Sequence, residues 1–312
     1  MALRLNSYFL KKIRVLLFVE NSCSFVDKNL TAITFQIFKD NMYPTLPKSY
    51  KHAYPFKIGT TSFVYPAGYV PNVKMLAPYV DEIELLLFES AKESLPTISE
   101  IKTLSLLAKD FDLSYNVHLP TDISIVSHDA AVADAAAEAL RRVIDLTSCL
   151  SPSTFTLHLP YHETSAEAAD VKTWQELARR GIARLLNTTG IKSETISVET
   201  LNYPFEWAED VINEFHLSIC IDIGHLIVYK RLFNLAFDRY SEKTSILHVH
   251  GVKENRDHLA LNHITEKDLH FFMDILQRFK QVVSLEVFSY NDLKNSLIFL
   301  EKCWQRGKDR KT

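Results

Sequence analysis

Eight short β-rich segments alternate with helical segments along most of this chain of 312 residues. The β-rich segments are dominated by Val, Ile, Leu, Thr and aromatic residues, which is typical of strands covered on both faces. We expect strands at 57–63, 82–88, 113–119, 153–159, 195–200, 217–223, 244–250 and 282–288. We expect helices at about 71–79, 97–110, 128–148, 165–189, 204–215, 225–240, 265–280 and 290–304. Eight repeats over 56–303 favour a single closed (β/α)₈ TIM barrel over a doubly wound open sheet, the alternative.

The beginning of the chain differs from the repeats. Three basic residues near position 12 precede only five apolar residues, at 15–19. A secretory signal needs an apolar core of roughly 7–15 residues, so this segment is a poor signal peptide. We expect 1–55 to be a poorly ordered extension, of which 1–41 is dispensable and lies upstream of a natural start at Met42. An extra ordered helix is the alternative. The barrel is expected at 56–304, and a charged tail at 305–312.

Composition excludes several classes of protein. The chain has 35 Lys and Arg against 38 Asp and Glu, a net charge of −3, which gives no basic footprint for nucleic acid. The 4 cysteines form no CxxC pair, which fits a reducing compartment. No GxGxxG or GxxxxGK[ST] loop and no run of about 18 apolar residues is present. We therefore expect a cytoplasmic enzyme that binds neither nucleic acid nor membrane.

Metal-ligating residue types recur at the carboxyl ends of six successive expected strands. Because these ends meet at one mouth of a barrel, we expect the side chains to lie close together. One such histidine is commonly a packing residue, but six matching positions are not. They are His118, His158, Glu199, Asp222, His250 and Glu286, and His225 and His258 follow in the next loops. Burying these groups is costly unless they bind a cation, and imidazole and carboxylate ligands suit Zn²⁺ or Mn²⁺.

Short motifs around these residues resemble the xylose isomerase-like barrel superfamily over about 56–300. They are HLP (twice), VET, DIGH, HVHG, DH and LEVF, and their ligand pattern is nearest to apurinic endonucleases of the endonuclease IV type. The resemblance implies one metal held by His118, His158 and Glu199. It implies a second metal, with Glu199 bridging, whose ligands are Glu199, Asp222, His250 and Glu286. It implies a third held by His225, His258 and a carboxylate, where this sequence has Arg256. We expect two or three zinc ions, with manganese as the alternative.

Longer segments resemble a narrower family, the cobamide-remodelling phosphodiesterases (the CbiR family). They are residues 59–90 and the motifs NVHLPTDIS, SPSTFTLHLPY, ISVETLNYPFEW, HGVKENRDHLAL and VSLEVFS. The resemblance implies a cobamide substrate, a vitamin B12-type cofactor whose nucleotide-loop phosphodiester is hydrolysed for corrinoid salvage. In this interpretation Glu199 and Glu286 are catalytic through the metals they hold. Arg256, together with Lys253, neutralises the phosphate, because its planar fork matches phosphate geometry. Solvated loop charges are the alternative for both basic residues.

Three other functions remain open for the same barrel. A sugar or sugar-phosphate isomerase or epimerase needs a single metal, with Glu199, Asp222, His250 and Glu286 as ligands. An apurinic endonuclease fits the ligand pattern but needs a basic face. A catalytically inactive binding protein is the third. His248, two residues before His250, is interpreted as a hydrogen-bonding partner of the ligands, and Glu84 is not assigned a role.

Overall fold

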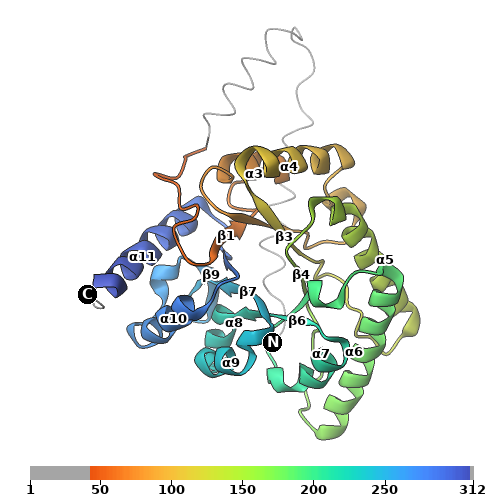
Figure 1. Ribbon diagram of the computed structural model, residues 1–312. Coiled ribbons are helices and arrows are strands. Elements are labelled where there is room, and N and C mark those ends of the chain that lie inside the picture. The colour runs from red at the N-terminus through yellow and green to blue at the C-terminus, as the bar shows by residue number, and fades with distance from the viewer. Residues whose placement is uncertain (1–42, 310–312) are drawn as a thin grey trace. The chain divides into compact units, whose positions relative to one another are not determined.

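The structure is a computed structural model that describes residues 43–309, and its core is a closed barrel of eight parallel strands (Figure 1). The barrel strands are β1 (Lys57–Thr61), β2 (Glu82–Leu86), β3 (Ser114–His118), β4 (Phe155–Leu157), β5 (Ile196–Glu199), β6 (Ser218–Asp222), β7 (Thr244–Val249) and β10 (Val282–Leu285). Their order around the barrel is β1-β10-β7-β6-β5-β4-β3-β2. The first and last strands pair in parallel, so the sheet has no open edge. The predicted (β/α)₈ barrel is confirmed, and the open sheet is excluded.

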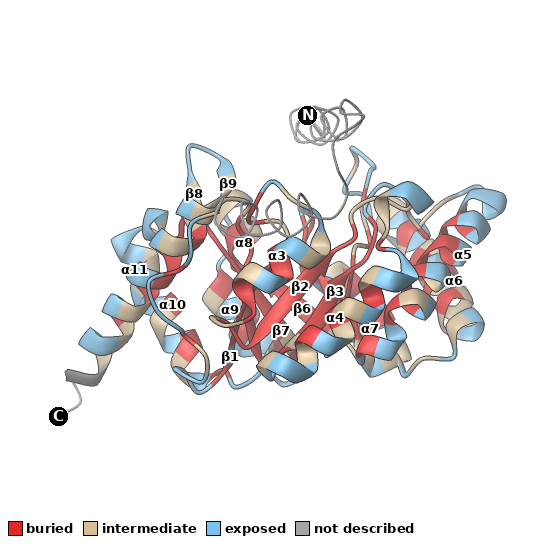
Figure 2. Ribbon diagram, turned by 90° about the horizontal axis from the view of Figure 1, so that it is seen from above, coloured by how far each residue is buried: buried red, intermediate tan, exposed pale blue. Residues whose placement is uncertain are grey.

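The helices surround the strands and lie close to the expected positions. The α-helices are α3 (Tyr69–Leu76), α4 (Ile98–Phe111), α5 (Ala130–Thr147), α6 (Ala168–Thr189), α7 (Glu209–Phe215), α8 (Ile223–Val228), α9 (Phe233–Tyr240), α10 (Glu266–Arg278) and α11 (Tyr290–Asp309). Short 3₁₀ helices are η1 (Lys92–Ser94), η2 (Ser148–Leu150), η3 (Ser193–Thr195), η4 (Phe205–Ala208), η5 (Ser241–Lys243) and η6 (Leu261–His263). Figure 2 shows buried strands at the centre and helices exposed on their outer faces.

The strands carry apolar and polar residues in alternation, and both kinds are buried. On β2, Ile83 and Leu85 alternate with Glu82 and Glu84, and all four are fully buried. Successive side chains of a strand point to opposite faces. The apolar residues therefore pack towards the helices, while the polar ones enter the barrel. Glu84 reaches across the interior, where the Ser284 hydroxyl of β10 donates a hydrogen bond to it at 2.6 Å. The interior of this barrel therefore contains hydrogen-bonded polar side chains.

Two local features differ from the expected pattern. The helix expected at 225–240 is divided into α8 and α9, because the chain takes a positive φ of 55° at Lys230. A hairpin of β8 (Gly251–Lys253) and β9 (Arg256–Leu259) follows β7 and was not expected. Its two turn residues, Glu254 and Asn255, both have positive φ, as a two-residue hairpin turn of type I′ requires. The hairpin lies directly after the strand that carries His248, so it belongs to the mouth of the barrel.

The predictions for the two ends of the chain can be compared with the structure only in part, because it describes residues 43–309. The prediction for 1–41 lies outside the described residues. Residues 46–55 belong to the same compact unit as the barrel, and Tyr50 is buried. The division into an extension, a barrel and a tail stays a prediction. Among the described helices none is long and apolar enough to cross a membrane.

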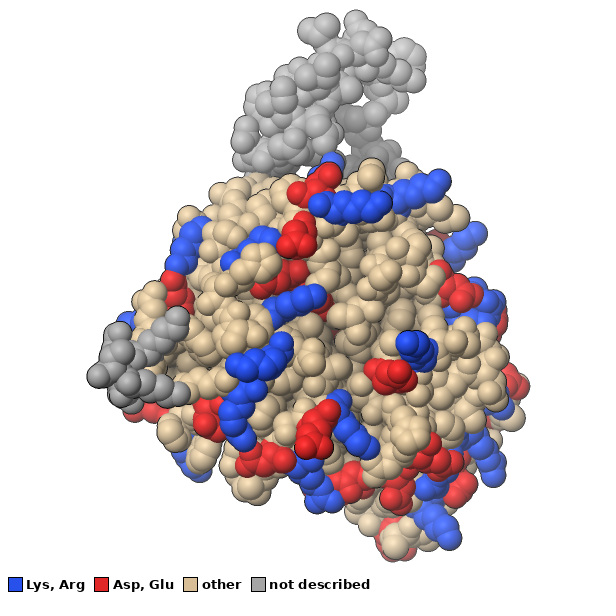
Figure 3. Space-filling model, in the orientation of Figure 1, with Lys and Arg blue, Asp and Glu red and all other residues tan. Residues whose placement is uncertain are grey.

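Charged side chains of both signs are scattered over one face of the molecule (Figure 3). On the face seen in Figure 3, Lys and Arg side chains are interspersed with Asp and Glu side chains. Many form pairs within or between helices, such as Arg141 with Glu138 and Arg278 with Asp238. Such exposed pairs contribute little to stability, and the burial of the helix faces contributes more.

Helix α4 allows a direct test of local stability. The Thr97 hydroxyl accepts a hydrogen bond from the Glu100 amide at 3.2 Å, and the Glu100 carboxylate accepts one from the Thr97 amide at 2.8 Å. We expect Thr97→Ala to lower the free energy of unfolding by about 1 kcal/mol, measured by urea denaturation. Ser99→Ala, two residues later and also exposed, is the control. Equal stability of the two variants would contradict the capping assignment.

Candidate metal centre

The ends of the parallel strands bring the predicted ligands together at one mouth of the barrel. His118, Glu199 and Asp222 are the last residues of β3, β5 and β6. His158, His250 and Glu286 directly follow β4, β7 and β10. The three carboxylates are at most 3% exposed. Since each strand contributes a different ligand, the site exists only when the barrel is closed.

The first group of ligand atoms is formed by His118, His158 and Glu199. Glu199 Oε2 lies 3.2 Å from His118 Nε2 and 2.6 Å from His158 Nε2. All three ligand atoms lie within 4.8 Å of one another. His118 is buried and its Nδ1 lies 3.0 Å from the carbonyl oxygen of Leu119, to which it donates as Nδ1–H. This hydrogen bond leaves Nε2 with its lone pair, which is the state that a metal requires.

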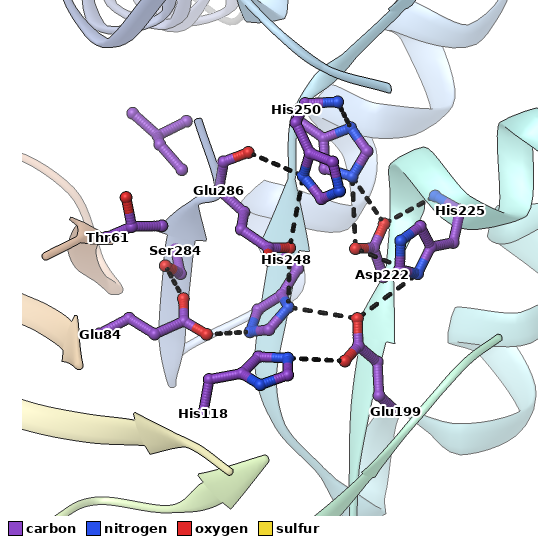
Figure 4. Close-up of polar contacts among 12 residues, drawn as sticks. Thr61, Glu84, His118, Glu199, Asp222, His225, His248, His250, Ser284 and Glu286 are labelled. Atoms are coloured by element: carbon purple, nitrogen blue, oxygen red, sulfur yellow. Dashed lines mark hydrogen bonds and ion pairs between the residues drawn. The ribbon is translucent and has the colours of Figure 1, made fainter. Parts of the chain in front are cut away.

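The second group is formed by Glu199, Asp222, His248 and Glu286 (Figure 4). His248 Nδ1 lies 3.2 Å from Glu286 Oε2 and 3.5 Å from Glu199 Oε1. Glu199 is therefore shared between the first and second groups, as the resemblance implied. The histidine differs, because the resemblance implied His250 in this group and His248 was expected as a hydrogen-bonding partner. Both side chains point to the same face of a strand of period two, so the sequence pattern alone does not distinguish them.

The third group consists of His225, His250 and His258, whose ligand atoms also lie within 4.8 Å of one another. His225 is held at the start of α8, where its amide donates to Asp222 Oδ1 at 2.7 Å. His258 lies on β9, and its Nδ1 is 3.2 Å from the carbonyl oxygen of Glu286. The structure places Arg256 on the exposed part of the same hairpin. A histidine thus stands in this group where the resemblance implied a carboxylate.

The surroundings of Glu199 and Glu286 shift the pKa values of these two carboxylates in opposite directions. Burial alone would raise the pKa of Glu199, but His158, His118 and His248 hold it well below its usual range. Burial also raises the pKa of Glu286, and the nearby carboxylates of Glu84 and Glu199 add to the effect. The shared carboxylate is therefore charged, while Glu286 is crowded by other acids.

The donor atoms of the second group fit a divalent cation. Glu199 Oε1 and Glu286 Oε2 are buried and accept no hydrogen bond from residues 43–309, although each lies within 3.5 Å of His248 Nδ1. A buried carboxylate oxygen without a partner is costly, and coordination of a cation would remove that cost. Imidazole nitrogens and carboxylate oxygens with no thiolate in the group suit Zn²⁺ or Mn²⁺. The site residues present therefore fit the metal that the sequence predicts.

A buried carboxylate beneath the centre supports His248. Glu84 of β2 is fully buried, and its Oε1 lies 3.1 Å from His248 Nε2. The other oxygen, Oε2, accepts the hydrogen bond from Ser284. A histidine ligand commonly directs its second ring N–H at a carboxylate, which fixes the orientation of the ring. This role was not predicted from the sequence, where the signal for it was the pair of acidic residues Glu82 and Glu84 in a β-rich segment.

Comparisons with known proteins agree with the fold. The family model described as a xylose isomerase-like TIM barrel matches residues 80–304. A D-tagatose 3-epimerase-like protein superposes with a TM-score of 0.69 and 17% identity, covering 82% of this chain and 100% of the other. An L-ribulose 3-epimerase gives 0.62 and 15%, covering 81% and 96%. The 3-keto-D-glucoside 4-epimerase YcjR from E. coli gives 0.60 and 15%, covering 80% and 100%. No curated protein matches the chain.

The contact between Glu84 and His248 generates a prediction. We expect Glu84→Leu to weaken zinc binding roughly 10- to 100-fold, because the ring of His248 loses the group that orients it. Glu84→Gln keeps an acceptor oxygen of the same size and should retain most of the affinity. Affinity is measured by competition with a chromophoric chelator, with Glu93→Gln on the exposed η1 as the control. Unchanged affinity in Glu84→Leu would exclude the supporting role.

Proposed function

The chain belongs to the xylose isomerase-like TIM-barrel family, and we propose that it is a metal-dependent phosphodiesterase. The proposed substrate is the nucleotide loop of cobamides, the vitamin B12-type cofactors. The metal centre supports the reaction type. The substrate rests on the resemblance of the long sequence motifs to cobamide-remodelling phosphodiesterases.

One observation carries the reaction type, and it is the sharing of Glu199 between two groups of ligands. A single metal would need only the second group, and His118 and His158 would then have no use. Two divalent cations, zinc or manganese, held by the two groups would supply Lewis acidity for hydrolysis at phosphorus. Glu199 and Glu286 are catalytic in this proposal because they hold the cations in place.

The hairpin after β7 offers cationic groups to a phosphate. Lys253 and Arg256 are directly opposite each other in its register, and both are exposed. Like charges in such a cross-strand pair repel each other, so binding of an anion between them would be favourable. The same hairpin carries His258, a member of the third group, so the side chains of Lys253 and Arg256 belong to an element that reaches the metal centre. In this proposal Arg256 binds the non-bridging oxygens and orients the phosphodiester.

Two aromatic residues line the same site. The ring centroid of Phe88 lies 5.2 Å from that of His118, and the centroid of Phe288 lies 4.8 Å from that of His258. Both phenylalanines are half-buried. An apolar part of a substrate would pack against them and exclude water from the reacting bond. This arrangement suits a substrate with a large flat group beside its phosphodiester.

A sugar epimerase is the second candidate. Its support is the superposition on several sugar epimerases and the presence of one complete group, Glu199, Asp222, His248 and Glu286. Likeness at 17% identity supports the fold rather than the substrate. The two candidates differ in their need for His118 and His158, and that difference can be tested.

We expect the zinc-loaded protein to convert adenosylcobalamin to a cobinamide-type corrinoid, with release of the lower nucleoside or nucleotide. The products are followed by chromatography and mass spectrometry, and their masses identify the bond that is cleaved. A chelator should abolish the conversion, and Glu199→Ala should remain inactive with added zinc. Unchanged cofactor in the presence of protein with two bound metals would exclude the cobamide substrate.

The double variant His118→Asn/His158→Asn separates the two candidate functions. A phosphodiesterase should lose one metal per chain and its hydrolytic activity, because the first group is broken. An epimerase should keep its remaining metal and its activity on ketohexoses. Metal content is measured by mass spectrometry, and His270→Asn, exposed on α10, is the control. Full hydrolytic activity in the double variant would refute the two-metal proposal.

Arg256 provides a test of phosphate binding. We expect Arg256→Gln to lower kcat/KM roughly 10- to 100-fold, as for loss of a hydrogen bond to a charged group. Arg256→Lys should give an intermediate value, because it keeps the charge and loses the planar fork. Lys267→Gln on α10 is the control for loss of an exposed positive charge. A normal kcat/KM in Arg256→Gln would show that Arg256 does not bind the phosphate and is a solvated loop charge.

A further inference from the structure

His250 differs from the other histidines of the centre in how its ring is hydrogen-bonded. The backbone amide of His258 donates a hydrogen bond to His250 Nδ1 at 2.9 Å. Because Nδ1 accepts, it carries the lone pair, and the proton of the neutral ring is on Nε2. That Nε2 lies 3.1 Å from Asp222 Oδ1 and 3.3 Å from Oδ2. Both ring nitrogens are therefore already used, and neither offers a lone pair to a metal.

Three neighbouring histidines have the opposite arrangement. The Nδ1 atoms of His118, His225 and His258 lie 3.0, 3.2 and 3.2 Å from backbone carbonyl oxygens. A carbonyl oxygen only accepts, so these rings carry the proton on Nδ1 and the lone pair on Nε2. This is the usual state of a histidine that binds a metal through Nε2. Hydrogen bonds to the backbone thus leave the Nε2 lone pair of these three rings available to a metal, whereas the Nε2 of His250 carries a proton.

The ring of His250 is also held by close packing against Gly224. A Cβ atom at position 224 would lie 1.9 Å from His250 Cε1 and 2.3 Å from Nδ1. No such contact is sterically allowed, so only glycine permits the ring to lie there. Gly224 stands between Asp222 and His225 in the DIGH motif. The motif therefore supplies two candidate ligands, Asp222 and His225. Gly224 between them leaves the space for the ring of His250, which contacts Asp222.

We propose that His250 is a positioning residue and not a metal ligand. Its Nε2–H holds the carboxylate of Asp222, and its Nδ1 holds the hairpin through the amide of His258. Asp222 is thereby fixed from two sides, because the His225 amide also donates to Oδ1. This leaves His225 and His258 as the imidazole donors of the third group. The inference rests on the metal dependence of the proposed function and is independent of its substrate.

Conservative substitutions separate the two hydrogen bonds of His250. Gln places its amide nitrogen near the position of Nε2, so His250→Gln retains the donor to Asp222. Asn places its oxygen near the position of Nδ1, so His250→Asn retains the acceptor for the hairpin. His250→Leu retains neither. Gly224→Ala displaces the ring without removing it. His225→Gln and His258→Gln remove expected ligands, and His270→Gln on α10 is the control.

The experiment measures metal ions per chain, zinc affinity by competition, and the visible absorption of the cobalt(II)-loaded proteins. We expect His250→Gln to keep the full metal count and the cobalt spectrum. We expect His250→Leu and Gly224→Ala to keep the count at saturating zinc, with an affinity roughly 10- to 100-fold lower. His225→Gln and His258→Gln should each lower the count or change the cobalt spectrum.

Two results would overturn the inference. One is loss of a metal ion or a changed cobalt spectrum in His250→Gln, which would make His250 a ligand. The other is full zinc affinity in both His250→Leu and Gly224→Ala, which would remove its positioning role. Failure of the proposed function has a different signature, because the unchanged protein would then bind its metals normally and leave a phosphodiester intact. A protein that takes up no metal would contradict both.

Discussion

The buried carboxylate of Glu199 is the feature on which the whole centre depends. It is fully buried, and it contacts two histidines through one oxygen and lies near two more through the other. A charge at this depth is tolerated only with several compensating partners. Those partners come from β3, β4, β7 and the start of α8, so only the closed barrel assembles them. Formation of the centre therefore depends on closure of the sheet.

The layer below the centre explains why the interior of this barrel is polar. Large branched apolar side chains usually fill such an interior, yet here Ser284 donates a hydrogen bond to Glu84, and Glu84 contacts His248. An apolar layer would avoid the free-energy cost of burying polar groups, but it would leave the ring of His248 free to rotate. The polar layer exchanges some stability for a fixed direction of the ligands, which a metal centre requires.

The sequence contained most of the fold and much of the site. All eight barrel strands were predicted, because apolar runs bounded by helices have few other solutions. That the candidate ligands lie close together was predictable, because strand ends in a barrel share one mouth. Which histidine of the HVH segment joins which group was not predictable, since residues two apart face the same side. The hairpin was missed because its turn uses Glu254 and Asn255 in place of glycine.

The similarity to sugar epimerases and the proposed hydrolysis of a phosphodiester have a common structural basis. The group formed by Glu199, Asp222, His248 and Glu286 would serve a single metal, and its residues lie on or directly after β5, β6, β7 and β10. The additional histidines, His118 and His158, lie at the end of β3 and directly after β4. A fold comparison is insensitive to such positions, so it returns the architecture and not the chemistry. The two candidate functions differ in their need for a second set of partners of Glu199, and in this structure Glu199 contacts His118 and His158.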